Sequence, residues 1–205
     1  MQTMHAEKNE NSKVLILVGG IFALSGAAAL LYQITWQRLL FLVFGVDMEA
    51  VTIIVTVFML GLGIGGLAGG WVADKWRMSC IPLFFLCELL IGIFGVFSKY
   101  FIAQLHLGEG FVLVFIQSSL LLLIPTALMG ATLPLLSVAL VQRGVVIAET
   151  VGRLYYFNTI GAALTCLSAG FLIFNHIGLS AAINWAVGMN FTIVCLGIIL
   201  RRYWS

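Results

Sequence analysis

The sequence predicts an all-α integral membrane protein of about six transmembrane helices, and two observations lead to this fold class. Of the 205 residues, 62% are hydrophobic and only 9% are charged, whereas a typical soluble domain has about 25% charged residues. The apolar residues are also grouped into stretches of about 20, the length that an α-helix needs to cross a bilayer. A soluble fold of this size could not bury so much apolar surface, so lipid is expected to cover much of it.

Six stretches meet this length criterion, and shorter, more polar connections separate them. In chain order they are Val14–Tyr32, Val51–Val72, Ile81–Phe97, Phe111–Val141, Leu154–Phe174 and Ala181–Leu200. The polar residues 1–13 are expected to form a disordered cytoplasmic tail, and residues 14–202 a single transmembrane domain.

Two of the six stretches contain irregular features. The first resembles the apolar part of a cleavable signal peptide, but its apolar run continues to Tyr32, which favours a retained spanning helix. The residues 33–46 that follow either extend this helix or lie along the membrane interface. The fourth stretch contains Pro125 and Pro134, which predict a kinked or broken helix because proline lacks the backbone N–H donor.

The positive charges predict the orientation in the membrane. If the N-terminus is cytoplasmic, eight of the ten Lys and Arg residues fall on the cytoplasmic side, as the positive-inside rule requires. The two exceptions are Arg38 and Lys99. Both termini are therefore expected in the cytoplasm. Trp36, Tyr100 and Tyr155 lie near segment ends, as interfacial aromatic residues do.

A weak internal repeat relates the second and fifth stretches. A shift of 100 residues places Gly61 on Gly161 and Gly70 on Gly170. Because the shift spans three helices, the two copies run in opposite directions, as in the 3+3 inverted repeat of half a major facilitator fold. Alternatively, both helices simply need small residues for packing.

The second stretch contains a run of glycines. Residues 61–66 superficially match a phosphate-binding loop, but the sequence pattern lacks the β-strand that must precede such a loop. Gly61, Gly65 and Gly69 instead recur every four residues on one face of an apolar helix. Small residues at this spacing let two helix backbones approach closely, so these glycines are predicted to pack against another helix.

The end of the second stretch resembles a loop motif of the major facilitator superfamily. Gly70, Asp74 and Lys75 match the family pattern Gly-x-x-x-Asp-Arg between helices two and three, with Lys75 where the family has Arg, and Arg77 follows two residues later. The resemblance implies a conformational role, in which the Asp74 carboxylate contacts the end of a neighbouring helix. The alternative is that Asp74 caps a helix beside cytoplasmic positive charges.

Glu88 lies near the middle of the third stretch, among apolar neighbours. A carboxylate at this depth costs on the order of 2.5–3.5 kcal/mol, so Glu88 is expected to face the bundle interior and to be protonated or paired. Ser25, Thr126 and Asn190 are expected at the same depth, and none of them is a cation. Glu88 is therefore interpreted either as a site for a cation or proton, or as a protonated residue that hydrogen-bonds between helices.

The candidate ligand-binding residues comprise Glu88 and other polar residues in or near the apolar stretches. The others are Thr126, Asn158, Asn190, Gln33 and Arg38. Arg38 has an alternative interpretation, in which its side chain extends to the outer membrane interface.

The remaining composition excludes several classes of function. The net charge of +2 is too small to suggest nucleic-acid binding. The four cysteines, Cys80, Cys87, Cys166 and Cys195, are predicted to be small core residues without a disulfide framework. Neither a metal site nor a cofactor is expected.

Five parts of the chain together carry a family resemblance. They are residues 25–39, the glycine helix ending in Asp74, and residues 86–89, 125–136 and 152–162. These parts resemble the membrane half of the fused transporter-like and spermidine synthase-like proteins of prokaryotes. The resemblance covers nearly the whole chain from about residue 20, and implies a multi-pass protein of the prokaryotic cytoplasmic (inner) membrane.

The chain departs from this family in two respects. Gln33 stands where the family has Glu, so a second intramembrane carboxylate is missing. Nothing in the sequence resembles the soluble aminopropyltransferase half of the family. Aminopropyl transfer needs a fold that holds the nucleotide donor beside the amine and accepts a proton, so the chain is expected to be non-catalytic.

Two functions follow as expectations. The first is a non-catalytic membrane module that anchors or partners a separately encoded aminopropyltransferase-like or methyltransferase-like protein, or binds a small cationic, polyamine-like metabolite. The alternative is a transporter-like half that forms a homodimer and moves a small solute. An enzyme acting alone is not favoured.

Overall fold

The computed structural model describes the residues 2–45, 47–105, 110–176 and 178–200, and all their side chains except those of 2–13, 47, 111, 172 and 175. The fold is 94% helical, and the described residues contain no strand. Five helices among them are long and apolar enough to cross a membrane. The chain is therefore an all-α, multi-pass membrane protein, as the composition predicts.

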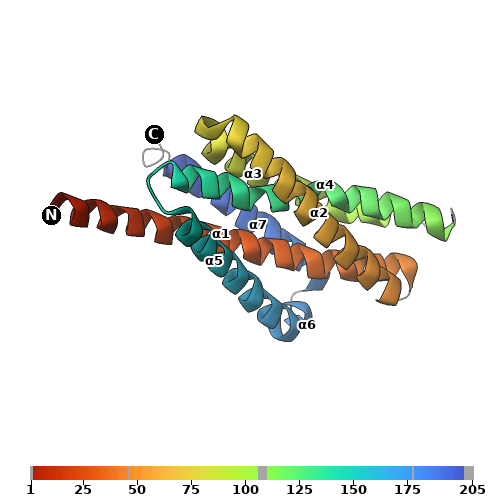
Figure 1. Ribbon diagram of the computed structural model, residues 1–205. Coiled ribbons are helices and arrows are strands. Elements are labelled where there is room, and N and C mark those ends of the chain that lie inside the picture. The colour runs from red at the N-terminus through yellow and green to blue at the C-terminus, as the bar shows by residue number, and fades with distance from the viewer. Residues whose placement is uncertain (1, 46, 106–109, 177, 201–205) are drawn as a thin grey trace.

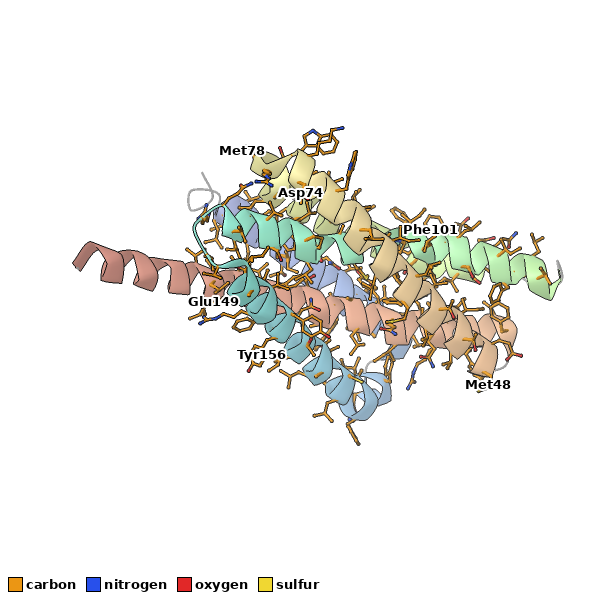
Figure 2. The ribbon with its side chains drawn as sticks, in the orientation of Figure 1. Met48, Asp74, Met78, Phe101, Glu149 and Tyr156 are labelled. Carbon is orange, nitrogen blue, oxygen red and sulfur yellow. The ribbon has the colours of Figure 1, made fainter. Side chains whose placement is uncertain are left out.

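The helices form one bundle with alternating directions. In chain order the elements are α1 (Gln2–Phe44), α2 (Asp47–Lys75), the 3-10 helix η1 (Arg77–Ser79), α3 (Cys80–Ala103), α4 (Phe111–Val141), α5 (Ile147–Ser168), the π-helical turn η3 (Ala169–Ile173), α6 (Phe174–His176) and α7 (Gly178–Ile199). Figure 1 shows the start of α1 and the end of α7 at the same end of the bundle. Asp74, Met78 and Glu149 also lie toward that end, whereas Met48 and Phe101 lie toward the other (Figure 2).

Helix α1 is longer than the first apolar stretch at both ends. Its backbone is helical from Gln2, whereas the sequence predicts a disordered tail over residues 1–13. At its other end α1 continues to Phe44, so residues 33–44 extend the helix and do not lie apart from it along the interface. The extension is stabilised by packing, because Trp36 and Leu40 are fully buried. The assignment of Trp36 as an interfacial residue is therefore wrong.

Helix α4 has the same bounds as the fourth predicted stretch, and Pro125 and Pro134 both lie inside it. The helix is therefore not broken, and the kink at its prolines stays a prediction. Prolines are tolerated inside membrane helices where hydroxyl side chains and neighbouring helices support the backbone. Here Thr126 donates a hydrogen bond to the carbonyl of Leu122, at 2.8 Å, and α4 packs extensively against α2.

The fifth predicted span, Leu154–Phe174, is helical but is not among the five helices that qualify as spans. Its polar residues, including Asn158, lie in α5, while its more apolar end forms the π-helical turn η3. The π-helical turn thus separates the apolar end of the segment from the rest of the helix. Hydropathy along the sequence cannot reveal this, because it depends on composition and not on the helix type.

Two apolar clusters fill the interior, one toward each end of the bundle. The cluster toward the Asp74 end includes Leu15, Phe22, Ala73, Phe84, Leu136 and Leu154. The cluster toward the Met48 end includes Trp36, Leu40, Ile53, Ile102, Val114 and Ile183. Cys80 and Cys87 are buried members of the cluster toward the Asp74 end, as predicted. Cys166 and Cys195 are exposed, which corrects their prediction as core residues. Cysteine behaves as a small apolar side chain, so it also suits a face of the bundle that contacts lipid.

Two closely packed helix pairs, α2 with α4 and α1 with α5, make the most extensive contacts in the bundle. A Cβ atom added to Gly65 would overlap the backbone carbonyl of Ala127 in α4, and one added to Gly61 would overlap the Thr126 side chain. In the second pair, a Cβ on Gly161 would overlap the backbone of Ala23 in α1. We call these contacts the α2–α4 seam and the α1–α5 seam.

Candidate functional site

Glu88 of α3 lies at the centre of a junction of three helices. Its side chain is fully buried. The Ser25 hydroxyl of α1 donates a hydrogen bond to Glu88 Oε1 at 2.6 Å, and Asn190 Nδ2 of α7 donates to Glu88 Oε2 at 2.7 Å. We call Ser25, Glu88 and Asn190 the polar junction. Each carboxyl oxygen therefore has a neutral donor from a different helix.

The polar junction lies between the two apolar clusters. On α3, Cys87 belongs to the cluster toward the Asp74 end and Ile91 to the other. On α7, Val187 belongs to the cluster toward the Met48 end and Ile193 to the cluster toward the Asp74 end, with Asn190 between them. Apolar side chains thus separate the junction from both ends of the bundle. Hydrogen bonds to Glu88 are consequently made where water competes least.

Three buried polar atoms in α1 and α7 have no hydrogen-bond partner among the described residues: Asn190 Oδ1 in the junction and, further along α1, the Tyr32 hydroxyl and Trp36 Nε1. The Tyr32 and Trp36 rings stack on the α1 face that continues from Ser25, with centroids 4.8 Å apart. Gly95 of α3 makes room for the Tyr32 hydroxyl, because a Cβ atom at Gly95 would overlap it. Unpaired buried polar atoms are rare and mark places where a small ligand or water can bind.

Thr126 and Asn158 lie in the two seams and not in the polar junction. The Thr126 hydroxyl bonds back to carbonyls of its own helix and faces Gly61 across the α2–α4 seam. Asn158 Nδ2 donates to the Phe22 carbonyl of α1 at 3.2 Å, across the α1–α5 seam. Both residues therefore connect or space helices in this structure.

Gln33 and Arg38 occupy the part of α1 beyond the junction. Gln33 is half-buried and Arg38 is exposed. The Arg38 guanidinium lies 3.9 Å from the centroid of the Phe174 ring in α6, a cation–π contact. Of the candidate ligand-binding residues, the structure thus brings Glu88 and Asn190 into direct contact.

The candidate conformational loop follows α2 at the surface. Asp74 Oδ1 and an Arg77 Nη atom are 3.7 Å apart, and both side chains are largely exposed. Lys75 Nζ lies 4.8 Å from the Trp71 ring centroid. A Cβ atom added to Gly70 would meet open space. An exposed ion pair of this length contributes little to stability.

A scan against models of known protein families finds no match, and searches of curated proteins and of solved structures find none either. Function is therefore inferred from the residues and their geometry. The fold is shown to be a helical membrane bundle, and the site with the most distinctive chemistry is the polar junction.

The sequence predicted Ser25 and Asn190 as neighbours of Glu88, which the hydrogen bonds confirm, but it did not single out the buried Tyr32 hydroxyl. Ser25, Tyr32 and Trp36 are seven and four residues apart, which places them on one face of a helix. This spacing is the feature of the sequence that indicates a shared helix face. The indication is weak, because a helix face carrying two aromatic residues usually packs in an apolar core.

Proposed function

We propose that the chain is a non-catalytic membrane module that binds a small cation at Glu88. The observation that carries the proposal is a fully buried carboxyl group whose oxygens accept from neutral donors among the described residues, with the unpaired Asn190 Oδ1 beside it. A charged carboxylate without a cation is costly at this depth. We therefore infer that Glu88 is protonated when the site is empty and ionised when a cation is bound.

The atoms around Glu88 suit an ammonium group. A primary ammonium has three N–H donors and no acceptor. The two Glu88 oxygens and the unpaired Asn190 Oδ1 can accept such donors, and the unpaired Tyr32 hydroxyl lies about two helical turns beyond Ser25 on the same face of α1. A small cationic, polyamine-like metabolite is the ligand class that this chemistry favours, and the resemblance to spermidine synthase-like proteins points to the same class.

Spermidine binding to the purified protein tests this proposal. Wild-type protein should bind spermidine in isothermal titration, and Glu88→Gln should lose binding because glutamine keeps the shape but cannot supply charge. Glu149→Gln is the matched control, because Glu149 is an exposed acid that pairs with Arg153 on α5. A wild type without binding, or a Glu88→Gln variant that binds equally well, would exclude the site.

The proposal includes six membrane passes in a 3+3 inverted repeat, with α5 and η3 as the fifth pass. Two features support it. The repeat would pair α1 with α4, α2 with α5 and α3 with α7. This exchange converts the α2–α4 seam into the α1–α5 seam, and these two seams are the most extensive helix contacts. Gly61 and Gly161 both lie in a seam, whereas Gly70 and Gly170 both have open space where a Cβ atom would be. The 100-residue shift relates the members of each pair.

We further propose that the protein lies in the prokaryotic cytoplasmic (inner) membrane with both termini cytoplasmic. The charge distribution supports this orientation. Arg77, Arg143 and Arg153 lie at the end of the bundle where α4 ends and α5 begins, which we call the basic end, whereas Arg38 and Lys99 lie toward the opposite end. Positive charge concentrates on the cytoplasmic side of membrane proteins.

Single cysteines in a cysteine-free background test the orientation. Met78, at the basic end, is 92% exposed, and Gln104 is exposed beyond α3 at the other end. In intact cells, a membrane-impermeant maleimide should label Gln104→Cys and not Met78→Cys. The reverse pattern would invert the proposed topology.

The family resemblance adds a role as membrane partner of a separately encoded aminopropyltransferase-like or methyltransferase-like protein. The alternative function is a transporter-like half that forms a homodimer. The open glycine positions on the outer face of α2, Gly63 and Gly70, favour a helix contact with a second copy, since small residues let membrane helices approach. Spermidine uptake by proteoliposomes that contain a crosslinked dimer would support the alternative, and binding by a monomer without uptake would support the module.

A further inference from the structure

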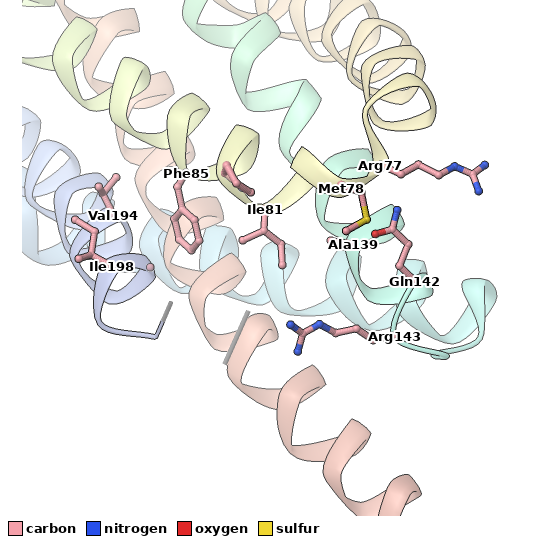
Figure 3. A pocket seen from close by; sticks show the side chains of 11 residues that line it. Arg77, Met78, Ile81, Phe85, Ala139, Gln142, Arg143, Val194 and Ile198 are labelled. Carbon is pink, nitrogen blue, oxygen red and sulfur yellow. The ribbon is translucent and has the colours of Figure 1, made fainter. Parts of the chain in front are cut away.

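A cavity of about 780 Å³ opens at the basic end between α3, α4 and α7 (Figure 3). Its walls are mainly apolar, with Ile81 and Phe85 from α3 and Val194 and Ile198 from α7. This volume lies within the range of about 300–1,000 Å³ typical of small-molecule sites. The polar junction does not contribute to its lining, so it is a second, separate feature of the molecule.

The polar groups of this cavity are concentrated on one side. Arg77, Gln142 and Arg143 line it there, and its lining, among the described residues, contains no Asp or Glu. Figure 3 shows the Arg143 guanidinium directed back beneath Ile81, and the Arg77 guanidinium directed away toward the surface. Arg77 also faces Asp74 across 3.7 Å, with both side chains largely exposed, so its charge is only partly offset.

An apolar cavity with guanidinium groups on one side fits an amphiphilic anion. Guanidinium groups bind phosphate with two parallel hydrogen bonds, while the apolar walls remove a hydrocarbon chain from water. The cavity lies at the ends of membrane-crossing helices, where lipid headgroups are found. Basic pockets between such helices are suited to anionic lipid headgroups.

We propose that this cavity binds one anionic phospholipid, with an acyl chain between α3 and α7 and the phosphate at Arg143. A free phosphate would use the arginine but would leave the apolar walls without a partner. A zwitterionic phospholipid would offer the same chain, but its own cation would compete with Arg143 for the phosphate. The combination of both features therefore selects an anionic lipid.

Titration with short-chain lipids in neutral detergent, followed by native mass spectrometry, tests the proposal. Dihexanoyl phosphatidylglycerol should bind wild-type protein at least about tenfold more tightly than dihexanoyl phosphatidylcholine or inorganic phosphate. Arg143→Gln should weaken phosphatidylglycerol binding about tenfold. The control Arg153→Gln should leave it unchanged, since Arg153 lies at the same end, outside the lining, and pairs with Glu149.

A second pair of variants tests the apolar wall. Val194→Trp should fill the cavity and weaken phosphatidylglycerol binding, whereas Ile199→Trp, at a 72% exposed position outside the lining, should not. If Arg143→Gln does not fold, Arg143→Lys keeps the charge but loses the two parallel hydrogen bonds, and it should bind phosphatidylglycerol more weakly than wild type. Equal binding of both lipids, binding of phosphate alone, or insensitivity to Val194→Trp would overturn the proposal.

Discussion

The α2–α4 seam and the polar junction hold the bundle together in opposite ways. In the seam, Gly61, Gly65 and Gly69 bring α2 into close contact with α4. In the junction, Glu88 and Asn190 connect helices through buried hydrogen bonds. Lipid tails are as apolar as the side chains, so membrane helices associate through close packing and interhelical hydrogen bonds. The seam leaves no room for an added side-chain atom, whereas the junction has an unpaired acceptor, Asn190 Oδ1. This difference favours a structural role for the seam and ligand binding for the junction.

The largest expected effect breaks the seam. Gly65→Leu should prevent folding or assembly, because the added side chain would overlap the Ala127 carbonyl; overpacking alone costs about 1–3 kcal/mol, and more where backbone must move. Gly20→Leu is the control, since Gly20 has no atom within 4 Å of a Cβ position. Expression yield and thermal stability in detergent measure both. Equal stability of the two variants would remove the seam as the basis of helix packing.

A second test asks whether the two seams are equivalent. Gly161→Ala should destabilise the protein by about as much as Gly61→Ala, roughly 1–3 kcal/mol, because a Cβ atom at either position overlaps the facing helix. Gly70→Ala and Gly170→Ala should be close to neutral or slightly stabilising. Chemical unfolding in mixed micelles measures all four. A large effect in one seam only would argue against the 3+3 repeat.

The polar junction should be less sensitive than the seam to loss of its side chain. Glu88→Leu removes two interhelical hydrogen bonds, each worth about 0.6 kcal/mol on average in a membrane protein. A loss of about 1–2 kcal/mol is therefore expected. Glu88→Gln, which keeps hydrogen-bonding capacity, should remain close to wild type. The same unfolding assay measures both, and a Gln variant as unstable as the Leu variant would show that charge at Glu88 stabilises the fold.

The smallest expected effect concerns the exposed ion pair after α2. Asp74→Asn should change stability by less than about 1 kcal/mol, because Asp74 and Arg77 are largely exposed and 3.7 Å apart. If the loop controls conformation as its family resemblance implies, the same variant should instead change how fast spermidine reaches Glu88, measured by stopped-flow binding. Unchanged stability together with unchanged kinetics would leave Asp74 as a surface residue only.

The helices that cross the membrane could be predicted from the sequence because apolar length is a local property. Both bounds of Phe111–Val141 are correct, and the depth argument placed Ser25 and Asn190 beside Glu88. The π-helical turn after α5, the burial of Trp36 and the unpaired Tyr32 hydroxyl could not be predicted in this way. Each depends on which helices pack together, and hydropathy contains no information about helix neighbours.

The same depth argument was wrong for Thr126, which faces α2 in the seam. Position along a helix gives the level of a residue in the bundle, but the rotation of the helix about its axis decides which neighbouring helix the residue faces. Two prolines and several small residues leave α4 without a clear polar face in the sequence. The cavity at the basic end was missed for a similar reason, because its lining combines residues from three helices and η1.

The most direct test of the central claim is the infrared difference spectrum of the purified protein with and without spermidine. The proposal predicts loss of a protonated carboxyl band and gain of carboxylate bands in the wild type, because the bound ammonium group would ionise Glu88. Glu149→Gln should give the same change, and Glu88→Gln should give none. A wild-type spectrum without this change, or the same change in Glu88→Gln, would contradict cation binding at Glu88.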